Sequence, residues 1–163
     1  MTRNPITPEG YVALEAELKR QKSVVRPQIV RDIEEARAHG DISENSEYED
    51  AKERQSLCEG RIAQLENLVA SAEIIDVAKL PRNGRAVFGT TVVLEHIDSG
   101  AEHRYRIVGE SESDVEQGKI SYTSPFGRAM IGREEGDEVT VPAPGGDKKY
   151  EIVEVLYLGP NDG

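Results

Sequence analysis

A long run of less polar residues, spaced at alternating steps of three and four, begins at Tyr48. The run comprises Tyr48, Ala51, Gln55, Cys58, Ile62, Leu65, Val69 and Ala72. This spacing is a heptad pattern, which predicts a continuous α-helix that buries one narrow stripe against a partner. Charged residues such as Glu49, Lys52 and Glu66 lie on the other faces, so the partner must cover that stripe and little else.

The upstream segment has the same three-four spacing of less polar residues and supplies a partner for this helix. Its less polar positions are Tyr11, Leu14, Leu18, Gln21 and Val25. Thr7 is suited to the N-cap of this helix and Pro8 to its first position. The rhythm then slips, because Ile29, Ile33 and Ala36 continue it only after an extra step of four, a stutter that locally unwinds a coiled coil. Pro27 lies at the slip, and we expect a bend there without a break.

Two helices joined by a short turn predict an antiparallel hairpin, and Gly40 can end the first helix in a left-handed conformation. Thr7 to His39 is 33 residues, or about 50 Å of helix. We expect the hairpin tip, residues 39–46, to project well beyond a small domain with a radius of gyration of about 12 Å.

After residue 76 the pattern changes to strand-like runs separated by Gly- and Pro-containing turns. The runs are residues 90–97, 103–109, 119–124, 137–144 and 148–158. Residues 124–132 have room only for a turn and a short helix, and the last run, apolar on both faces, is expected in mid-sheet. The sequence predicts an α+β chain: a coiled-coil hairpin over residues 1–76, then a small, mostly antiparallel sheet domain with a short helix over residues 77–163.

Composition narrows the function classes. The net charge of −11 argues against a protein that holds nucleic acid by its own field, because phosphate binding relies on Lys and Arg. The single Cys58 leaves no internal disulfide and suits a reducing compartment. No signal peptide and no membrane span is recognisable, so we expect a cytoplasmic protein without a membrane partner.

Five acids lie within ten residues at the predicted turn: Asp41, Glu44, Glu47, Glu49 and Asp50. One interpretation is helix capping, since Asp41 and Ser43 are good N-caps and Glu44 follows Asp41 by three residues, as in a capping box. The other is a metal site, because Asp41 and Glu44 can point their carboxylates at one Mg²⁺. Two exposed carboxylates hold Mg²⁺ weakly, so such a site requires a cleft that already contains a metal or phosphates.

The stretches "RPQIVRDIEEARAHG", "GDISENSEYEDAKERQSLCEGRI" and "ISYTSPFGRAMIGREEGDEVTVPAPGG" resemble the GreA/GreB family of bacterial transcript cleavage factors. The resemblance extends over essentially the entire chain. The few basic residues near the tip resemble the GreA members of the family.

This resemblance implies a factor that binds RNA polymerase and inserts its coiled coil into the secondary channel. There it stimulates Mg²⁺-dependent cleavage of the nascent RNA 3′ end in backtracked complexes. It implies no enzymatic activity, no cofactor in the free protein and no small-molecule substrate. Asp41 and Glu44 match the acids that share Mg²⁺ in the polymerase active centre, and Ser43 matches an orienting group.

The resemblance also implies that an FKBP-like C-terminal domain docks on the polymerase through Ser124, Pro125 and Phe126. The alternative for these residues is a turn with a buried Phe. Lys52 and Arg54, behind the tip, are candidates for RNA contacts. The alternative is that they form helix ion pairs with Glu47, Glu49 or Asp50.

Two functional alternatives stay open at this point. An FKBP-like domain could be a prolyl isomerase or chaperone, although the second half has few aromatic residues and no Trp. A factor that enters the channel could also regulate the polymerase without promoting cleavage.

Overall fold

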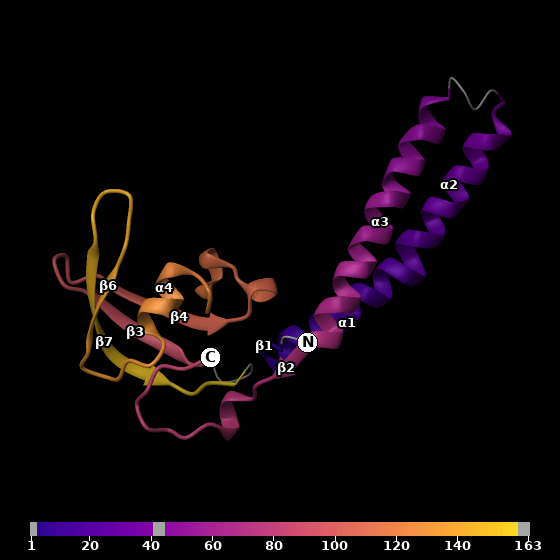
Figure 1. The fold of residues 1–163 in the computed structure, drawn as a ribbon. Helices are drawn as coiled ribbons and strands as arrows, with labels where there is room; N and C mark the ends of the chain where they lie inside the picture. The colour runs from indigo at the N-terminus through magenta and orange to yellow at the C-terminus, as the bar shows by residue number, and fades with distance from the viewer. Residues whose placement is uncertain (1–2, 41–44, 160–163) are drawn as a thin grey trace. The chain divides into compact units, whose positions relative to one another are not determined.

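The structure is a computed structural model that describes residues 3–40 and 45–159. Contacts divide the chain into two compact units: Tyr11–Ser71, and the segments before and after it (Figure 1). Among the described residues, no helix is both long and apolar enough to cross a membrane.

The first unit is the predicted helical hairpin. Its helices are α1 (Pro8–Arg20), a π-helical segment η1 (Gln21–Val25), α2 (Arg26–Ala38) and α3 (Ser46–Ser71). Figure 1 shows α2 and α3 running side by side along the hairpin. The predicted caps of α1 are confirmed, because the Thr7 hydroxyl accepts the Gly10 N–H at 3.1 Å and Pro8 is the first helical residue.

A continuous apolar seam holds α2 against α3. Its buried members are Ile29, Ile33, Ala51, Cys58 and Ile62, with Leu18, Val25 and Tyr48 packed at the margins. The heptad pattern predicted these contacts. The predicted pattern extended one residue beyond the end of α3, because Ala72 is the first residue of strand β2 (Ala72–Ile74). There, pairing with another strand replaces the hydrogen bonds of the helix.

The expected slip in the first helix is present, and its form is a π turn. The N–H of Arg26 bonds to the carbonyl of Gln21, which is five residues earlier. Each step of four advances about 40° beyond a full α-helical turn, so three successive steps would carry the stripe away from α3. The wider π turn takes up this excess and returns Val25 and Ile29 to the seam. Pro27 follows the π turn at the start of α2, where its missing N–H is tolerated.

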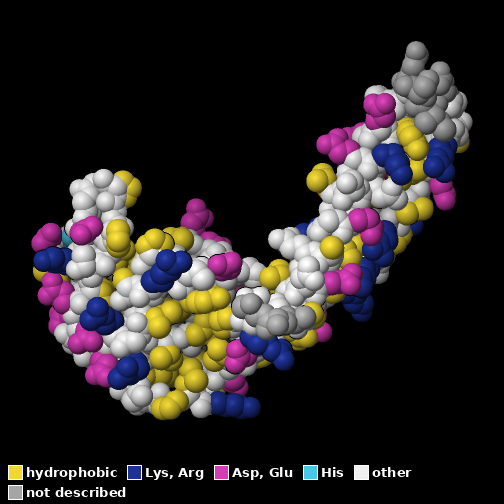
Figure 2. All heavy atoms as spheres, viewed as in Figure 1, with side chains coloured by type: hydrophobic (Ala, Val, Ile, Leu, Met, Phe, Trp, Pro, Cys, Tyr) yellow, Lys and Arg dark blue, Asp and Glu magenta, His cyan; other side chains and the backbone are white. Residues whose placement is uncertain are grey.

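Ion pairs connect the helices along the margins of the seam. Arg26 Nη2 lies 2.7 Å from Glu59 Oε1, and Lys22 Nζ lies 3.6 Å from Glu66 Oε1. The Arg26 guanidinium lowers the pKa of Glu59 by hydrogen bonding to its carboxylate. Figure 2 shows charges of both signs interspersed along the visible face of the hairpin.

The second unit contains a five-stranded sheet in the order β5-β4-β3-β7-β6. The strands are β3 (Thr91–His96), β4 (Glu102–Val108), β5 (Lys119–Ser121), β6 (Glu138–Val141) and β7 (Lys148–Leu156). Neighbours are antiparallel except β4 and β5, which are parallel. All five predicted strand runs form strands, and the predicted short helix is α4 (Pro125–Met130). Single-turn 3₁₀ helices span Val77–Lys79, Glu110–Glu112 and Val115–Gln117.

Strand β7 lies inside the sheet, as expected, but only one of its faces is buried. Ile152 is fully buried, whereas Val153 is 45% exposed. The register between β3 and β7 shifts between Val93 and Leu94, which leaves Val153 unpaired in a β-bulge. The predicted mid-sheet position is confirmed, and the bulge places one apolar residue of this run, Val153, outside the core.

The core of the second unit lies on one face of the sheet, beneath α4. Its fully buried members include Leu94, Ile107, Met130 and Ile152. Figure 2 shows hydrophobic side chains gathered around α4 on the visible face of this unit.

The N-terminal strand β1 (Asn4–Ile6) also belongs to the second unit, which the sequence patterns did not predict. It pairs in parallel with β2, with Ile6 opposite Ile74. The first turn of α1 is anchored beside it, because Arg106 forms an ion pair with Glu9. The Glu112 carboxylate accepts the Thr7 N–H at 3.2 Å and a further bond from the Thr7 hydroxyl.

Candidate functional site

The predicted site residues Asp41, Ser43 and Glu44 lie outside the described residues. The structure describes both of their flanks, the end of α2 and the start of α3. It therefore shows which groups surround the tip and which of the nearby acids have contacts of their own.

Backbone hydrogen bonds and a glycine in an unusual conformation terminate helix α2. The His39 N–H bonds to the Ala36 carbonyl at 3.2 Å, and the Gly40 N–H bonds to the Arg37 carbonyl at 3.4 Å. Gly40 has a φ of +113°, a conformation that side chains with a Cβ rarely adopt. This confirms the sequence prediction that Gly40 ends the first helix.

Asn45 joins the two helices at the tip. Its Oδ1 accepts the Tyr48 N–H at 3.1 Å, which makes it the N-cap of α3. Its Nδ2 donates to the carbonyl of Ala36 at 2.7 Å, which satisfies a terminal acceptor of α2. Asn45 was not among the predicted caps, although Asn directly before a helical pattern is a strong N-cap signal.

Side-chain contacts reinforce this junction. Arg37 lies over the ring of Tyr48 at 5.7 Å from the ring centroid, and His39 Nδ1 lies 3.3 Å from Glu47 Oε2. Glu47 and Glu49 both lie in the first turn of α3, where negative charge favours the helix electrostatically. Glu47 and Glu49 thus have a local structural role.

The two candidate RNA-contact residues, Lys52 and Arg54, differ in the contacts that they already make within the protein. Arg54 bridges the helices, with Nη1 3.0 Å from Asp32 Oδ2 and Nε 3.5 Å from Asp50 Oδ2. Hydrogen bonds from Gln28 and Arg54 lower the pKa of Asp32. Lys52 Nζ donates to the neutral Gln55 amide at 3.1 Å. Arg54 therefore forms the ion pair that the structural alternative predicted, whereas Lys52 is exposed beside a neutral partner.

Within residues 3–40 and 45–159, no group of three or more His, Cys, Asp or Glu side chains is arranged to hold a metal ion. The Cys58 thiol is buried in the seam and donates to Gln21 Oε1 at 3.5 Å, as expected for a structural residue. The proposed Mg²⁺ ligands, Asp41 and Glu44, are outside these ranges.

The candidate docking residues lie at the start of α4. Ser124 is its N-cap, because Oγ accepts the Gly127 N–H at 3.0 Å and donates to the Ser121 carbonyl at 2.7 Å. Pro125 is the first helical residue and is exposed. The Phe126 ring is partly buried, with centroids 5.1 Å from Tyr105 and 5.2 Å from Tyr150.

These three residues also line a cavity of about 350 Å³. Tyr105 and Val115 contribute to the same wall, and Val115 is 67% exposed. The structure thus brings the predicted docking residues together with two that sequence analysis did not select. Phe126 both packs in the domain and faces the cavity, so the two interpretations of this stretch are compatible.

Comparison with known proteins extends over nearly the whole chain. A GreA/GreB family model described as "Transcription elongation factor, N-terminal" matches residues 4–74, and the model for the GreA/GreB C-terminal domain matches residues 81–157. "Transcription elongation factor GreA" of Anaeromyxobacter sp. (strain K) is 60% identical, covering 97% of this chain and 95% of the relative. The GreA of Hyphomonas neptunium is 55% identical, covering 96% and 99%.

A solved structure described as "Prokaryotic transcription elongation factor GreA/GreB from Nitrosomonas europaea" is 25% identical to this chain. The match covers 96% of this chain and 100% of that one, with a TM-score of 0.43.

Proposed function

The chain belongs to the GreA/GreB family of transcription elongation factors, and from this membership we propose how it acts on RNA polymerase. The hairpin enters the secondary channel, and the tip stimulates the polymerase's own nuclease to cut the nascent RNA 3′ end in backtracked complexes. The chain itself is not the nuclease. The observation that carries this proposal is 60% identity, over 97% of the chain, to a factor named GreA.

The hairpin supports the proposal by its dimensions and its cap. Helix α3 has 26 residues, or about 39 Å at roughly 1.5 Å per residue, enough to carry the tip into a deep channel. Because Asn45 already caps α3, that helix does not need Asp41 or Ser43 as its N-cap. The cap of α3 is therefore no reason to assign the tip acids a purely structural role.

Asp41 and Glu44 are proposed to share a Mg²⁺ ion within the polymerase active centre. Their carboxylates are the hard oxygen donors that Mg²⁺ prefers. The ion would stabilise charge on the attacked phosphate and lower the pKa of a bound water. The chain would contribute the two carboxylates and, through Ser43, a hydroxyl that orients the water. In the free protein we expect only weak Mg²⁺ binding, since two exposed carboxylates do not complete a site.

The test is RNA cleavage by backtracked polymerase complexes in the presence of Mg²⁺. The double variant Asp41→Ala, Glu44→Ala should lose stimulation by roughly 100-fold, the cost of misplacing a reacting group. The matched control Glu47→Ala, Glu49→Ala removes the same charge from the first turn of α3 and should keep most of the activity. Cleavage by the tip variant at the wild-type rate would show that the acids have no metal role.

The sheet domain is proposed to dock on the polymerase through Ser124, Pro125 and Phe126. Pro125 offers the cleaner test, because it is exposed and an acid is tolerated at a helix N-terminus. Pro125→Glu should weaken polymerase binding by roughly tenfold, with the unfolding midpoint unchanged. Equal affinity for the variant and wild type would remove Pro125 from the docking surface.

Lys52 is proposed as the RNA-contact residue of the pair, with Arg54 as a contributor only if its ion pairs open on insertion. The nascent RNA 3′ end inside the complex would be their partner. A factor that works on bacterial RNA polymerase acts in the cytoplasm. Neither the isomerase nor the regulator without cleavage gains support from the GreA relatives.

A further inference from the structure

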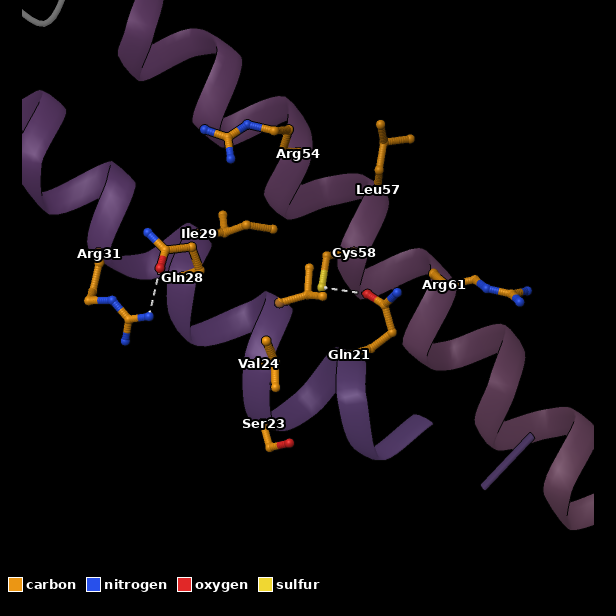
Figure 3. Close-up of a pocket in the computed structure, with 11 residues that line it drawn as sticks. Gln21, Ser23, Val24, Gln28, Ile29, Arg31, Arg54, Leu57, Cys58 and Arg61 are labelled. Atoms are coloured by element: carbon orange, nitrogen blue, oxygen red, sulfur yellow. Dashed lines mark hydrogen bonds between the residues drawn. The ribbon is translucent and has the colours of Figure 1, made fainter. Parts of the chain in front are cut away.

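An open groove of about 650 Å³ lies on one side of the hairpin, between the π-helical segment η1 and α3 (Figure 3). We call it the hairpin groove. Ile29 and Cys58, both buried, belong to its lining. All of its residues belong to the first compact unit, so its shape does not depend on the sheet domain.

Two large aliphatic side chains are exposed along this groove. Val24 in η1 is 58% exposed and Leu57 in α3 is 69% exposed. In the π turn, Gln21 and Val25 occupy the seam positions. Val24, between them in sequence, therefore lies outside the seam. Single exposed aliphatic residues are common, but two that line one groove form an apolar surface suited to a partner.

The charge of the groove is opposite to that of the chain. Its 11 lining residues include Arg31, Arg54 and Arg61 and no acid, although the whole chain has 31 acids and a net charge of −11. Figure 3 shows the three guanidinium groups around the margins of the groove.

Two of these arginines have neutral hydrogen-bond partners. Arg31 Nη2 donates to Gln28 Oε1 at 2.8 Å, and Arg61 Nη1 donates to Gln64 Oε1 at 2.6 Å. Arg54, in contrast, pairs with Asp32 and Asp50. Each also acts on a nearby carboxylate, Arg31 on Asp32 and Arg61 on Glu17, and helps to lower its pKa without forming an ion pair among the described residues. Both guanidinium groups are thus able to pair with an acidic partner.

We propose that the hairpin groove binds an acidic segment of RNA polymerase that presents aliphatic side chains. This inference rests on the proposed function and adds a contact along the hairpin to those of the tip and the docking domain. An apolar centre with arginines at its margin is the arrangement found in protein interfaces. RNA is the weaker fit, because the groove has no aromatic side chain on which a base could stack.

The first test is the affinity of full-length variants for RNA polymerase. Leu57→Glu places a negative charge in the groove and should weaken binding by roughly tenfold, the effect of losing a central interface contact. Leu57→Ala should weaken it less, because it removes only the apolar contact. Val12→Glu is the matched control, since Val12 is 64% exposed on the same hairpin but outside the groove.

Salt dependence tests the charge of the occupant. Binding of Arg61→Gln should be weaker than that of wild type at low salt and should depend less steeply on salt concentration, because one charge pair is lost. Variants at positions 57 and 61 that bind like wild type, while wild type binds and stimulates cleavage, would overturn the groove proposal alone. Wild-type protein that does not bind polymerase would overturn both proposals.

A photo-cross-linking amino acid at position 57, used in complexes assembled on backtracked RNA, identifies the occupant. The expected product joins the hairpin to a polymerase segment rich in Asp, Glu and aliphatic residues. Cross-linking to RNA, or no more cross-linking than from position 12, would contradict the proposal.

Discussion

At the scale of single residues, Asn45 determines how the hairpin closes. One side chain caps α3 through Tyr48 and satisfies α2 through the Ala36 carbonyl. Its two hydrogen bonds hold the ends of both helices at the flank of the acidic tip. These bonds use the amide's acceptor and its donor together.

Asn45→Ala should therefore lower the free energy of unfolding by about 1–2 kcal/mol, the usual cost of a lost N-cap. Asn45→Asp separates the two bonds, because a carboxylate keeps the acceptor for the Tyr48 N–H but cannot donate to the Ala36 carbonyl. Denaturant unfolding of the full chain measures both variants. If Asn45→Ala were as stable as wild type, the Asn45 bonds would have no net effect on stability.

Glu17 gives the hairpin a dependence on pH. Hydrogen bonds from Arg20, and then from Gln21, lower the pKa of Glu17 from 4.5 to about 2. A carboxyl group whose pKa is lower in the folded state than in the unfolded state stabilises the protein at pH values above its unfolded-state pKa. This stabilisation is lost as the pH falls through the folded-state pKa. The side chain is 31% exposed, so solvent screening keeps this contribution small.

We accordingly expect Glu17→Gln to flatten the pH dependence of stability between pH 4.5 and about pH 2. The free energy of unfolding, measured at a series of pH values, should fall less steeply for the variant than for wild type in this window. Parallel curves would show that Glu17 has the same pKa in the folded and unfolded chains.

At the scale of elements, the π turn reconciles a stutter in the sequence with a straight seam. Three consecutive steps of four, from Gln21 to Ile33, would rotate the apolar stripe out of contact with α3 in a regular α-helix. The π turn between Gln21 and Val25 corrects this rotation and leaves Val24 exposed. The same correction places Val24 beside the hairpin groove.

Deletion of Val24 should convert the π turn into regular α-helix and keep the seam aligned, since it shortens one step of four to three. We expect the stability to change by less than about 1 kcal/mol. Deletion of Arg31, an exposed residue in the regular helix α2, is the control. It should rotate the preceding seam residues by about 100° and cost at least about 2 kcal/mol through lost burial. Circular dichroism and denaturant midpoints distinguish the two deletions.

At the scale of the whole molecule, the residues that the structure describes form two separate core clusters. The hairpin core includes Ile62 and the sheet-domain core includes Ile152, each almost fully buried. Because the two clusters share no residue, each unit should lose stability independently when its own core is damaged.

Ile62→Ala should destabilise the hairpin, and Ile152→Ala the sheet domain, each by about 2–5 kcal/mol. Hydrogen exchange followed by mass spectrometry measures the protection of both units in one sample. Each variant should lose protection mainly in its own unit. Equal loss in both units from either variant would indicate one cooperative folding unit instead.

The sequence by itself determined the long helices, the hairpin, the five strands and α4, because heptad spacing, strand alternation, caps and glycine turns act between near neighbours. It also pointed to Asp41 and Glu44 through their resemblance to the tip acids of a known family. These two roles remain proposals that the cleavage assay tests.

Only the tertiary structure decided the β1–β2 pairing, the bulge at Val153, the second bond of Asn45 and the cavity beside Phe126. Each of these depends on groups that are distant in sequence: Ile6 meets Ile74, and Tyr105 meets Phe126. Such contacts leave no local periodicity, because their partners are chosen by packing and by unsatisfied backbone groups. The hairpin groove has the same origin, since its lining residues come together only where the π turn faces α3.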